Sequence, residues 1–231
     1  MRAMTAMFAD SAEWLLVTHI IGGAFALLAA LVAFSAKAWN VAHGWHVYSG
    51  LFFFWSMVLV IATALPLAIP ASNVFLLLIG LFSFYLAWSG WRYAKRRRAA
   101  QYGLDRVAAA LMAATSLAMI GYGVAMLVGG DYLGVALIVF GAIGGSLCSA
   151  DLRGKRVDER VRIAGHLTHM LAATIATLTA FLVTNVKVEP AIVIWLLPTV
   201  VITPVIALWN RRIMRGYRPK GMPSGDSRAR Q

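Results

Sequence analysis

Long apolar runs alternate with short polar connections along nearly the whole chain. Seven of these runs are long enough to cross a bilayer, whose hydrocarbon core requires about 20 mostly apolar residues. Their expected bounds are 11–36, 44–68, 71–94, 106–129, 132–150, 162–186 and 190–213. An open sheet cannot expose its edges to lipid, and the runs lack the alternation of a barrel strand. The pattern therefore predicts an all-α, polytopic membrane protein built as a bundle of seven transmembrane helices.

Short connections between the runs predict one seven-helix domain over residues 1–214, with no soluble domain. Residues 215–231 follow as a basic tail rich in Gly, Pro and Arg, which we expect to be flexible. The composition agrees, because 61% of the residues are hydrophobic and 13% are charged. A soluble domain carries about 25% charged residues. An ordinary water-soluble protein is therefore excluded.

Lysine and arginine are distributed unevenly among the connections. Of the 21 such residues, 19 fall in the first, third and fifth connections and the tail, and only Arg2 and Lys187 fall on the other side. By the positive-inside rule, the N-terminus lies outside and the C-terminus in the cytoplasm. The net charge of +12 could suggest nucleic acid. These clusters lie beside anionic lipid headgroups, however, which we expect as their partners instead of nucleic acid.

Ionisable residues are confined to the ends of the runs. No Asp, Glu, Lys or Arg lies well inside any run, which disfavours a proton-coupled transporter with a carboxylate relay. Asp151 is followed by the basic residues of the fifth connection, so we expect it to be a solvated loop charge. Cys148 is the only cysteine, which excludes an intrachain disulfide and disfavours a thiolate metal site.

Four of the five histidines form two H-x-x-H pairs, His43/His46 and His166/His169. Each pair opens an apolar run on the predicted cytoplasmic side. Because residues three apart share one helix face, we expect His166 and His169 to point roughly the same way. The positive end of the helix dipole disfavours imidazolium, so these rings are expected to be neutral and able to bind a metal.

Three interpretations of these histidines stay open. In the first, His46 and His166 ligate the iron of haem b, which is commonly held by histidine, and His169 or His43 is a supporting or alternative ligand. Such a protein would move electrons between a cytoplasmic donor and a membrane acceptor such as quinone.

In the second interpretation, three or four histidines hold zinc, with Asp151 nearby, in a membrane hydrolase acting on a lipid. In the third, the histidines bond only to helix ends and headgroups. A protein of that kind fits a non-catalytic accessory subunit of a larger membrane complex, in which the glycine-rich faces of the fourth and fifth runs make helix contacts. Whether the protein is an enzyme and whether it forms oligomers stay open at this point.

Two further residues are candidates. His19 lies near the outer end of the first run, roughly 20 Å from the other histidines along the bilayer normal. It is either part of a site of its own or bonded to a Thr or Tyr within the bundle. Tyr85 could contact a quinone or a lipid headgroup, although packing at the interface is the simpler interpretation.

Several segments of the chain together resemble an uncharacterised family of predicted bacterial multi-span integral membrane proteins. These segments are His19–Gly23, His46–Gly50, Phe82–Leu86 followed by Gly90–Arg92, and His166–Met170. The resemblance covers about residues 15–185 and implies a bacterial inner membrane location.

The histidines that match this family are His19, His46 and His166. The chain departs from the family at Val47 and His169, where arginine is common. The resemblance therefore implies His46 and His166 as the pair of ligands and disfavours a zinc site of four histidines. Helices that carry histidines are also found in membrane b-type cytochromes, which is a looser analogy.

Overall fold

A computed structural model describes residues 2–39, 41–95, 103–153 and 158–216 of the chain. This part folds into helices only, and each helix is long and apolar enough to cross a membrane. The helices are α1 (Arg2–Ala38), α2 (His43–Ala68), α3 (Val74–Lys95), α4 (Gly103–Val128), α5 (Gly134–Leu152), α6 (Glu159–Asn185) and α7 (Ile192–Met214). The predicted all-α class with seven spans is confirmed. Of the predicted tail, residues 217–231 lie outside the described residues.

The bounds of the helices follow the predicted runs closely, because all but one end fall within three residues of the expected position. The exception is the start of α1, which begins at Arg2 although its apolar run was expected to begin at residue 11. The connection between α2 and α3 ends at a side-chain cap. The side-chain oxygen of Asn73 accepts a hydrogen bond from the amide of Leu76 at 3.0 Å, which makes Asn73 the N-cap.

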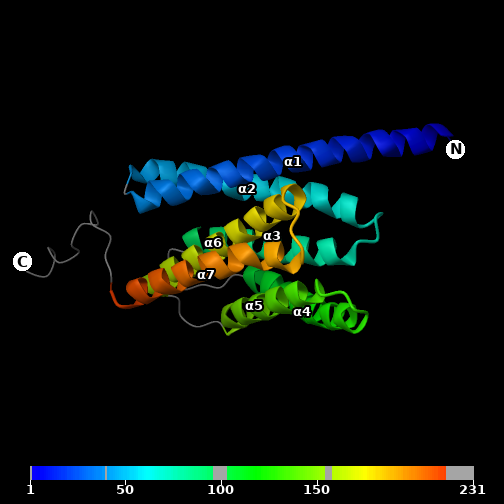
Figure 1. Ribbon diagram of the computed structural model, residues 1–231. Coiled ribbons are helices and arrows are strands. Elements are labelled where there is room, and N and C mark those ends of the chain that lie inside the picture. Colours follow the sequence, from blue (N-terminus) through cyan, green and yellow to red (C-terminus); the bar gives the residue numbers. More distant parts are fainter. Residues whose placement is uncertain (1, 40, 96–102, 154–157, 217–231) are drawn as a thin grey trace, which may run out of the picture.

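The helices form three layers, with α1 and α2 on one side, α4 and α5 on the other, and α3, α6 and α7 between them (Figure 1). Sequence neighbours pair as α1–α2, α4–α5 and α6–α7. The pair α3–α6 joins segments that lie far apart in the chain. Helix α3 also contacts α2, α4 and α5, so it is the central element around which the candidate site is assembled.

Glycines allow the closest approaches between helices, as expected for membrane bundles. A Cβ atom at Gly90 of α3 would lie 2.7 Å from the sulfur of Met170, and one at Gly165 of α6 would lie 2.6 Å from the ring of Tyr93. Helices α3 and α6 can therefore approach only because these positions have no side chain. Not every glycine serves this purpose, since a Cβ at Gly121 of α4 would meet no atom within 4 Å.

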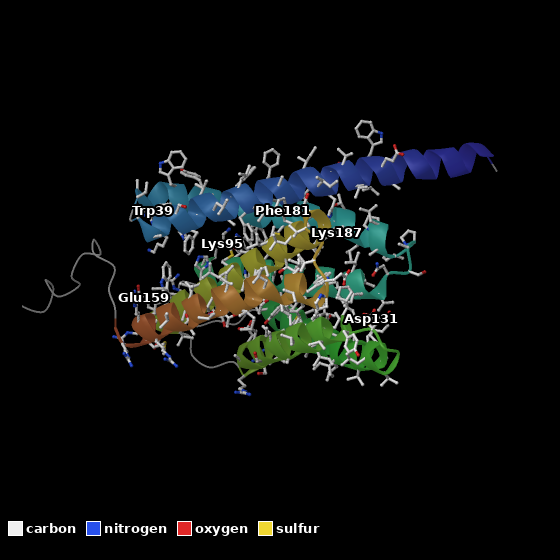
Figure 2. All side chains as sticks on the ribbon, in the orientation of Figure 1. Trp39, Lys95, Asp131, Glu159, Phe181 and Lys187 are labelled. Atoms are coloured by element: carbon white, nitrogen blue, oxygen red, sulfur yellow. The ribbon has the colours of Figure 1, made fainter. Side chains whose placement is uncertain are left out.

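One end of the bundle carries nearly all the described cations, and we call it the basic end. It is where α1, α3, α5 and α7 end and α2, α4 and α6 begin. Trp39 and Glu159 lie at this end, whereas Asp131 and Lys187 lie toward the opposite end (Figure 2). The described lysines and arginines of the basic end are Lys37, Arg92, Lys95, Arg106, Arg153, Arg160, Arg162, Arg211, Arg212 and Arg215.

The start of α6 depends on a side-chain cap. The Asp158 carboxylate accepts a hydrogen bond from the amide of Val161 at 2.8 Å. We expect Asp158→Ala to lower the free energy of unfolding by about 1 kcal/mol, because it leaves an amide of the first turn without its acceptor. Thermal unfolding in detergent measures this loss. Glu159→Ala removes a neighbouring carboxylate and keeps the cap, so an equal loss in both variants would contradict the prediction.

Candidate functional site

The rings of His46 and His166 meet at the basic end of the bundle. His46 lies in the first turn of α2, and His166 lies in the second turn of α6. Their ring centroids are 6.1 Å apart and the ring planes are perpendicular. Both side chains are partly buried. The sequence placed these two residues at one depth, and the structure brings them into contact.

Each of the two rings is held by a backbone carbonyl of a neighbouring helix. Nδ1 of His46 lies 3.0 Å from the carbonyl oxygen of Ala33 in α1, and Nδ1 of His166 lies 2.9 Å from that of Gly90 in α3. A carbonyl oxygen can only accept, so Nδ1 of both rings must be the protonated nitrogen. In the neutral ring, Nε2 then carries the lone pair. This is the arrangement that fixes and orients histidines that ligate metals.

Aromatic side chains pack between α2 and α3, next to Gly90, whose carbonyl holds His166. Phe54 of α2 stacks on Trp91 of α3 with ring centroids 4.7 Å apart and planes inclined by 7°. Trp91 also packs against Trp88, and the ammonium of Lys95 lies 4.4 Å from the centroid of the Trp91 ring. A stacked aromatic group with a cation beside it therefore lies between α2 and α3.

Side chains, and not backbones, bridge α2 and α6. In the described part of the chain no Cα atom of α2 comes within 8 Å of a Cα atom of α6. Met57 and Thr177 nevertheless touch across this space, since the Thr177 hydroxyl lies 3.3 Å from the Met57 sulfur. The wide separation leaves room for large side chains, including the two imidazoles, between the helices.

His169 does not join this pair, although it lies on the same helix as His166. It is buried among Tyr85 and Tyr93 of α3 and Asp151 of α5. The expectation that His166 and His169 point the same way is wrong in this detail. Three residues turn a helix by about 300°, so the two side chains diverge by about 60°. That difference directs His166 to α2 and His169 to α5.

His43 is the first residue of α2 and is exposed. In the described residues, no group of three or more His, Cys, Asp or Glu side chains is placed to hold a metal ion. The structure thus brings together His46 and His166, and it places His43 and His169 outside that pair.

Asp151 is not the solvated loop charge that the sequence suggested. It lies in the last turn of α5 and is only 6% exposed. The hydroxyl of Tyr85 donates to its Oδ2 at 2.7 Å, and the hydroxyl of Tyr93 donates to its Oδ1. Nε2 of His169 lies 3.8 Å from Oδ2. Tyr85 accordingly packs inside the bundle, where its hydroxyl contacts a carboxylate.

His19 forms a separate contact in the other half of the bundle. Its Nδ1 lies 3.1 Å from the carbonyl oxygen of Val60 and 3.1 Å from the hydroxyl oxygen of Thr63. The Thr63 hydroxyl itself donates to backbone carbonyls of α2. His19 was expected either to form a site of its own or to bond to a Thr or Tyr within the bundle. The contact with Thr63 agrees with the second interpretation. His19 then joins α1 to α2.

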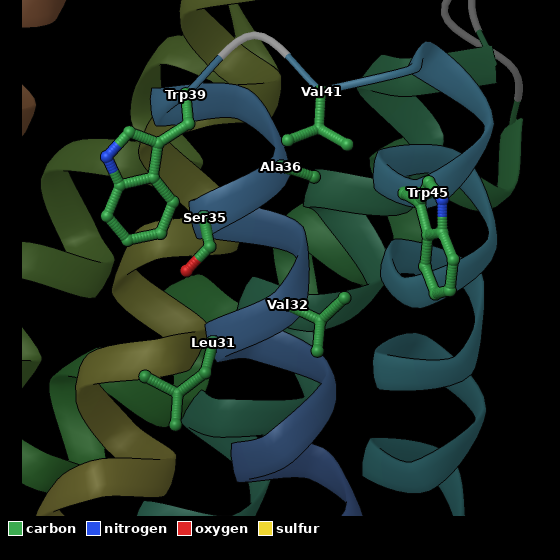
Figure 3. A pocket seen from close by; sticks show the side chains of 7 residues that line it. All are labelled: Leu31, Val32, Ser35, Ala36, Trp39, Val41 and Trp45. Carbon is green, nitrogen blue, oxygen red and sulfur yellow. The ribbon is translucent and has the colours of Figure 1, made fainter.

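An apolar groove lies at the basic end, beside the turn between α1 and α2 (Figure 3). It has a volume of about 290 Å³, and none of its lining residues is a histidine. The exposed side chains of Trp39 and Trp45 flank it. Tryptophan is enriched where a membrane meets water, so these residues are suited to mark the interface at this end. The lining residues are Leu31, Val32, Ser35, Ala36, Trp39, Val41 and Trp45.

Comparisons with protein-family models, with curated proteins and with solved structures give no match for this chain.

Proposed function

We propose that the protein is a multi-pass protein of the bacterial inner membrane, with its N-terminus outside and its C-terminus in the cytoplasm. Seven helices able to span a membrane support this proposal. The concentration of described cations at one end supports it as well, because the cytoplasmic side of a membrane protein is the basic side. In this orientation the His46–His166 pair lies close to the cytoplasmic surface.

We further propose that the protein binds haem b, which His46 and His166 would hold. This proposal depends mainly on how the two rings are held. In each ring Nδ1–H is bonded to a backbone carbonyl, which leaves the lone pair of Nε2 available to a metal ion. The two rings are also close to each other, with centroids 6.1 Å apart, so one bound group could contact both of them.

The number of protein ligands favours haem over zinc. A zinc ion requires three or four protein ligands, whereas haem iron takes four of its ligands from the macrocycle and needs two more. Within the described ranges, no His, Cys, Asp or Glu side chain is placed to join His46 and His166 as a third ligand. The cations of the basic end suit a group that carries two carboxylates, and the stacked rings of Phe54 and Trp91 follow Gly90 in the same region of α3.

Haem iron would supply one-electron transfer at this position. The backbone carbonyls of Ala33 and Gly90 would orient the two histidines. Since both rings are partly exposed near the basic end, the site suits exchange between a cytoplasmic donor and a membrane acceptor such as quinone. The zinc hydrolase and the accessory subunit are the alternatives against which this proposal is tested.

The absorption spectrum of the detergent-purified protein, first oxidised and then reduced with dithionite, tests the proposal. We expect a Soret band that sharpens on reduction, with α and β bands, and we expect these bands to be lost in His46→Ala and His166→Ala. His43→Gln and His19→Gln are the controls and should keep the full spectrum. Circular dichroism would establish that each variant is folded.

A featureless spectrum from folded wild-type protein would overturn the haem proposal. Bound zinc and activity lost with a chelator would then favour the hydrolase, and co-purifying membrane proteins without any cofactor would favour the accessory subunit. His166→Met gives a further measurement, since a methionine ligand raises the potential of haem iron. A potential unchanged by that substitution would exclude His166 as a ligand.

A further inference from the structure

Two threonine hydroxyls of α6 and α7 are buried without a hydrogen-bond partner. Thr179 of α6 is 3% exposed, and Thr199 of α7 is 9% exposed. In the part of the chain that the structure describes, neither Oγ1 atom has a partner. A buried hydroxyl without a partner is costly, and it is more costly inside a bilayer, where no bulk water surrounds the helix. The proposed haem site uses neither threonine.

A threonine inside a helix usually bonds to its own backbone. Other threonines of the described helices do so, because their hydroxyls donate at 2.9 Å to the carbonyl four residues earlier; these are Thr63, Thr115, Thr174, Thr177 and Thr184. Thr179 and Thr199 do not make this bond. Their hydroxyls are therefore oriented toward something else, and the carbonyls of Ile175 and Trp195 each have a second lone pair that these hydroxyls do not use.

The register of α6 and α7 places the two threonines opposite each other. The helices are antiparallel neighbours joined by residues 186–191 (Figure 1). Near the basic end, Asn210 of α7 donates to the hydroxyl of Thr168 in α6 at 2.7 Å. Thr179 lies 11 residues after Thr168, and Thr199 lies 11 residues before Asn210. Eleven residues make three turns plus about 20°, so both threonines lie on the faces that meet at Asn210, roughly 16 Å farther along. The burial of both hydroxyls agrees with this placement.

Both threonines lie inside the membrane span, nearer the end opposite the basic end. At 1.5 Å per residue, each is about 10 Å from the end of its helix there. A groove of about 440 Å³ opens at that end, and its lining includes Asp131, Glu189 and Ile192, the first residue of α7. The side chains of Asp131 and Glu189 are exposed, so the groove is a polar one. Water in this groove lies about two turns from Thr199.

The polar groups at this position suit a small uncharged ligand. Helix α6 carries no charged residue after Arg162, and α7 carries none before Arg211. A calcium or magnesium ion takes six or more oxygen ligands, usually including carboxylates. A buried water molecule instead takes two to four hydrogen bonds from polar groups that have no other partner. Its oxygen can accept from both hydroxyls, and its protons can be donated to the carbonyls of Ile175 and Trp195.

We propose that Thr179 and Thr199 form a water-binding site within the membrane, which holds one water molecule between α6 and α7. Each hydroxyl donates to the oxygen of this water, and the water donates to a carbonyl of each helix. No covalent bond forms or breaks. The site links α6 to α7 at a second point, beyond the bond between Asn210 and Thr168. It does not depend on a metal at the basic end.

Water-edited solid-state NMR tests this site, because it detects side chains that receive magnetisation from nearby water. The protein is labelled with ¹³C-threonine in lipid vesicles, and its signals are assigned from sequential correlations. We expect Thr179 and Thr199 to receive magnetisation at short mixing times. Thr177 is the matched control and should receive it much later, since it is buried on the same helix and its hydroxyl is bonded to Ala173. Equal transfer to Thr177 and Thr179 would overturn the proposal.

A double-mutant cycle gives an independent measurement. Valine has the shape of threonine without its hydroxyl, so Thr179→Val or Thr199→Val leaves the water one hydrogen bond short. We expect each variant to unfold at a lower fraction of denaturing detergent than the wild type. The double variant should lose clearly less than the sum of the two losses. Thr184→Val removes an exposed hydroxyl near the same end of α6, so as the control it should unfold with the wild type.

The two measurements together separate a bound water from the alternatives. A gain in stability in either single variant would show that its hydroxyl is buried without a ligand, and additive losses would show that the two threonines share none. Either result would overturn the proposal. Coupled losses without early transfer from water would indicate a direct bond between Thr179 and Thr199, which would overturn it as well. The wild-type spectrum decides whether water is bound even if a variant fails to fold.

Discussion

Arg92→Ala is expected to lower the free energy of unfolding by about 3–5 kcal/mol, the range measured when one partner of a buried ion pair is removed. Nε of Arg92 donates to Oδ1 of Asp105 at 2.7 Å, and Nη2 donates to Oδ2 at 3.1 Å. The Asp105 side chain is only 4% exposed. Without the guanidinium, the buried carboxylate of Asp105 would lose both hydrogen bonds from Arg92, and this link from α3 to α4 would be lost.

A double variant separates the cost of these lost hydrogen bonds from that of lost packing. In Arg92→Met with Asp105→Leu, both charges are replaced by apolar side chains, and we expect most of the stability to return. Unfolding with a denaturing detergent, followed by circular dichroism, measures both effects. Lys37→Ala, at an exposed position, serves as the control and should change stability little. A loss in Arg92→Ala no larger than that of the control would show that the pair contributes nothing.

Gly123→Ala is expected to destabilise the bundle by about 1–3 kcal/mol, as overpacking of a close contact generally does. Its new Cβ would lie 2.7 Å from the carbonyl oxygen of Gly134 and 2.9 Å from Ile138. Because the first of these neighbours is backbone, no rotation of a side chain can relieve the clash. Helices α4 and α5 would have to move apart.

The same helix provides a matched control for this substitution. A Cβ at Gly121 would meet no atom within 4 Å, so Gly121→Ala should be neutral or should stabilise by about 0.5–1 kcal/mol through helix propensity. The same detergent unfolding measurement compares the two variants. Equal stability of both variants would mean that α4 and α5 do not pack at Gly123.

The residues that sequence reasoning missed are those whose partners lie far away in the chain. Asp151 was expected to be a solvated loop charge and Asp105 was not singled out, although each lies in a terminal turn of a helix and is buried. One available signal was the presence of two phenols, Tyr85 and Tyr93, about two turns apart on α3. A polar face on a central helix calls for a polar partner, but the spacing does not identify which of the other helices provides it.

The sequence by itself determined the seven helices, their approximate ends and the common depth of His46 and His166. These features are local, because an apolar run must be long enough to cross the bilayer and a histidine at its start must lie near one surface. Only the tertiary structure decided that α2 and α6 present their histidines to each other, with α1 and α3 supplying the carbonyls that hold them.

The tertiary structure also separated His169 from His166 and directed it to Asp151. The physical reason is that helix packing depends on which faces fit together. Small residues such as Gly90 and Gly165 allow α3 and α6 to approach, and the rotation of each helix then selects the partners of its side chains. Hydrophobic patterning fixes where a helix begins and ends, whereas the fit between distant surfaces fixes what its polar side chains touch.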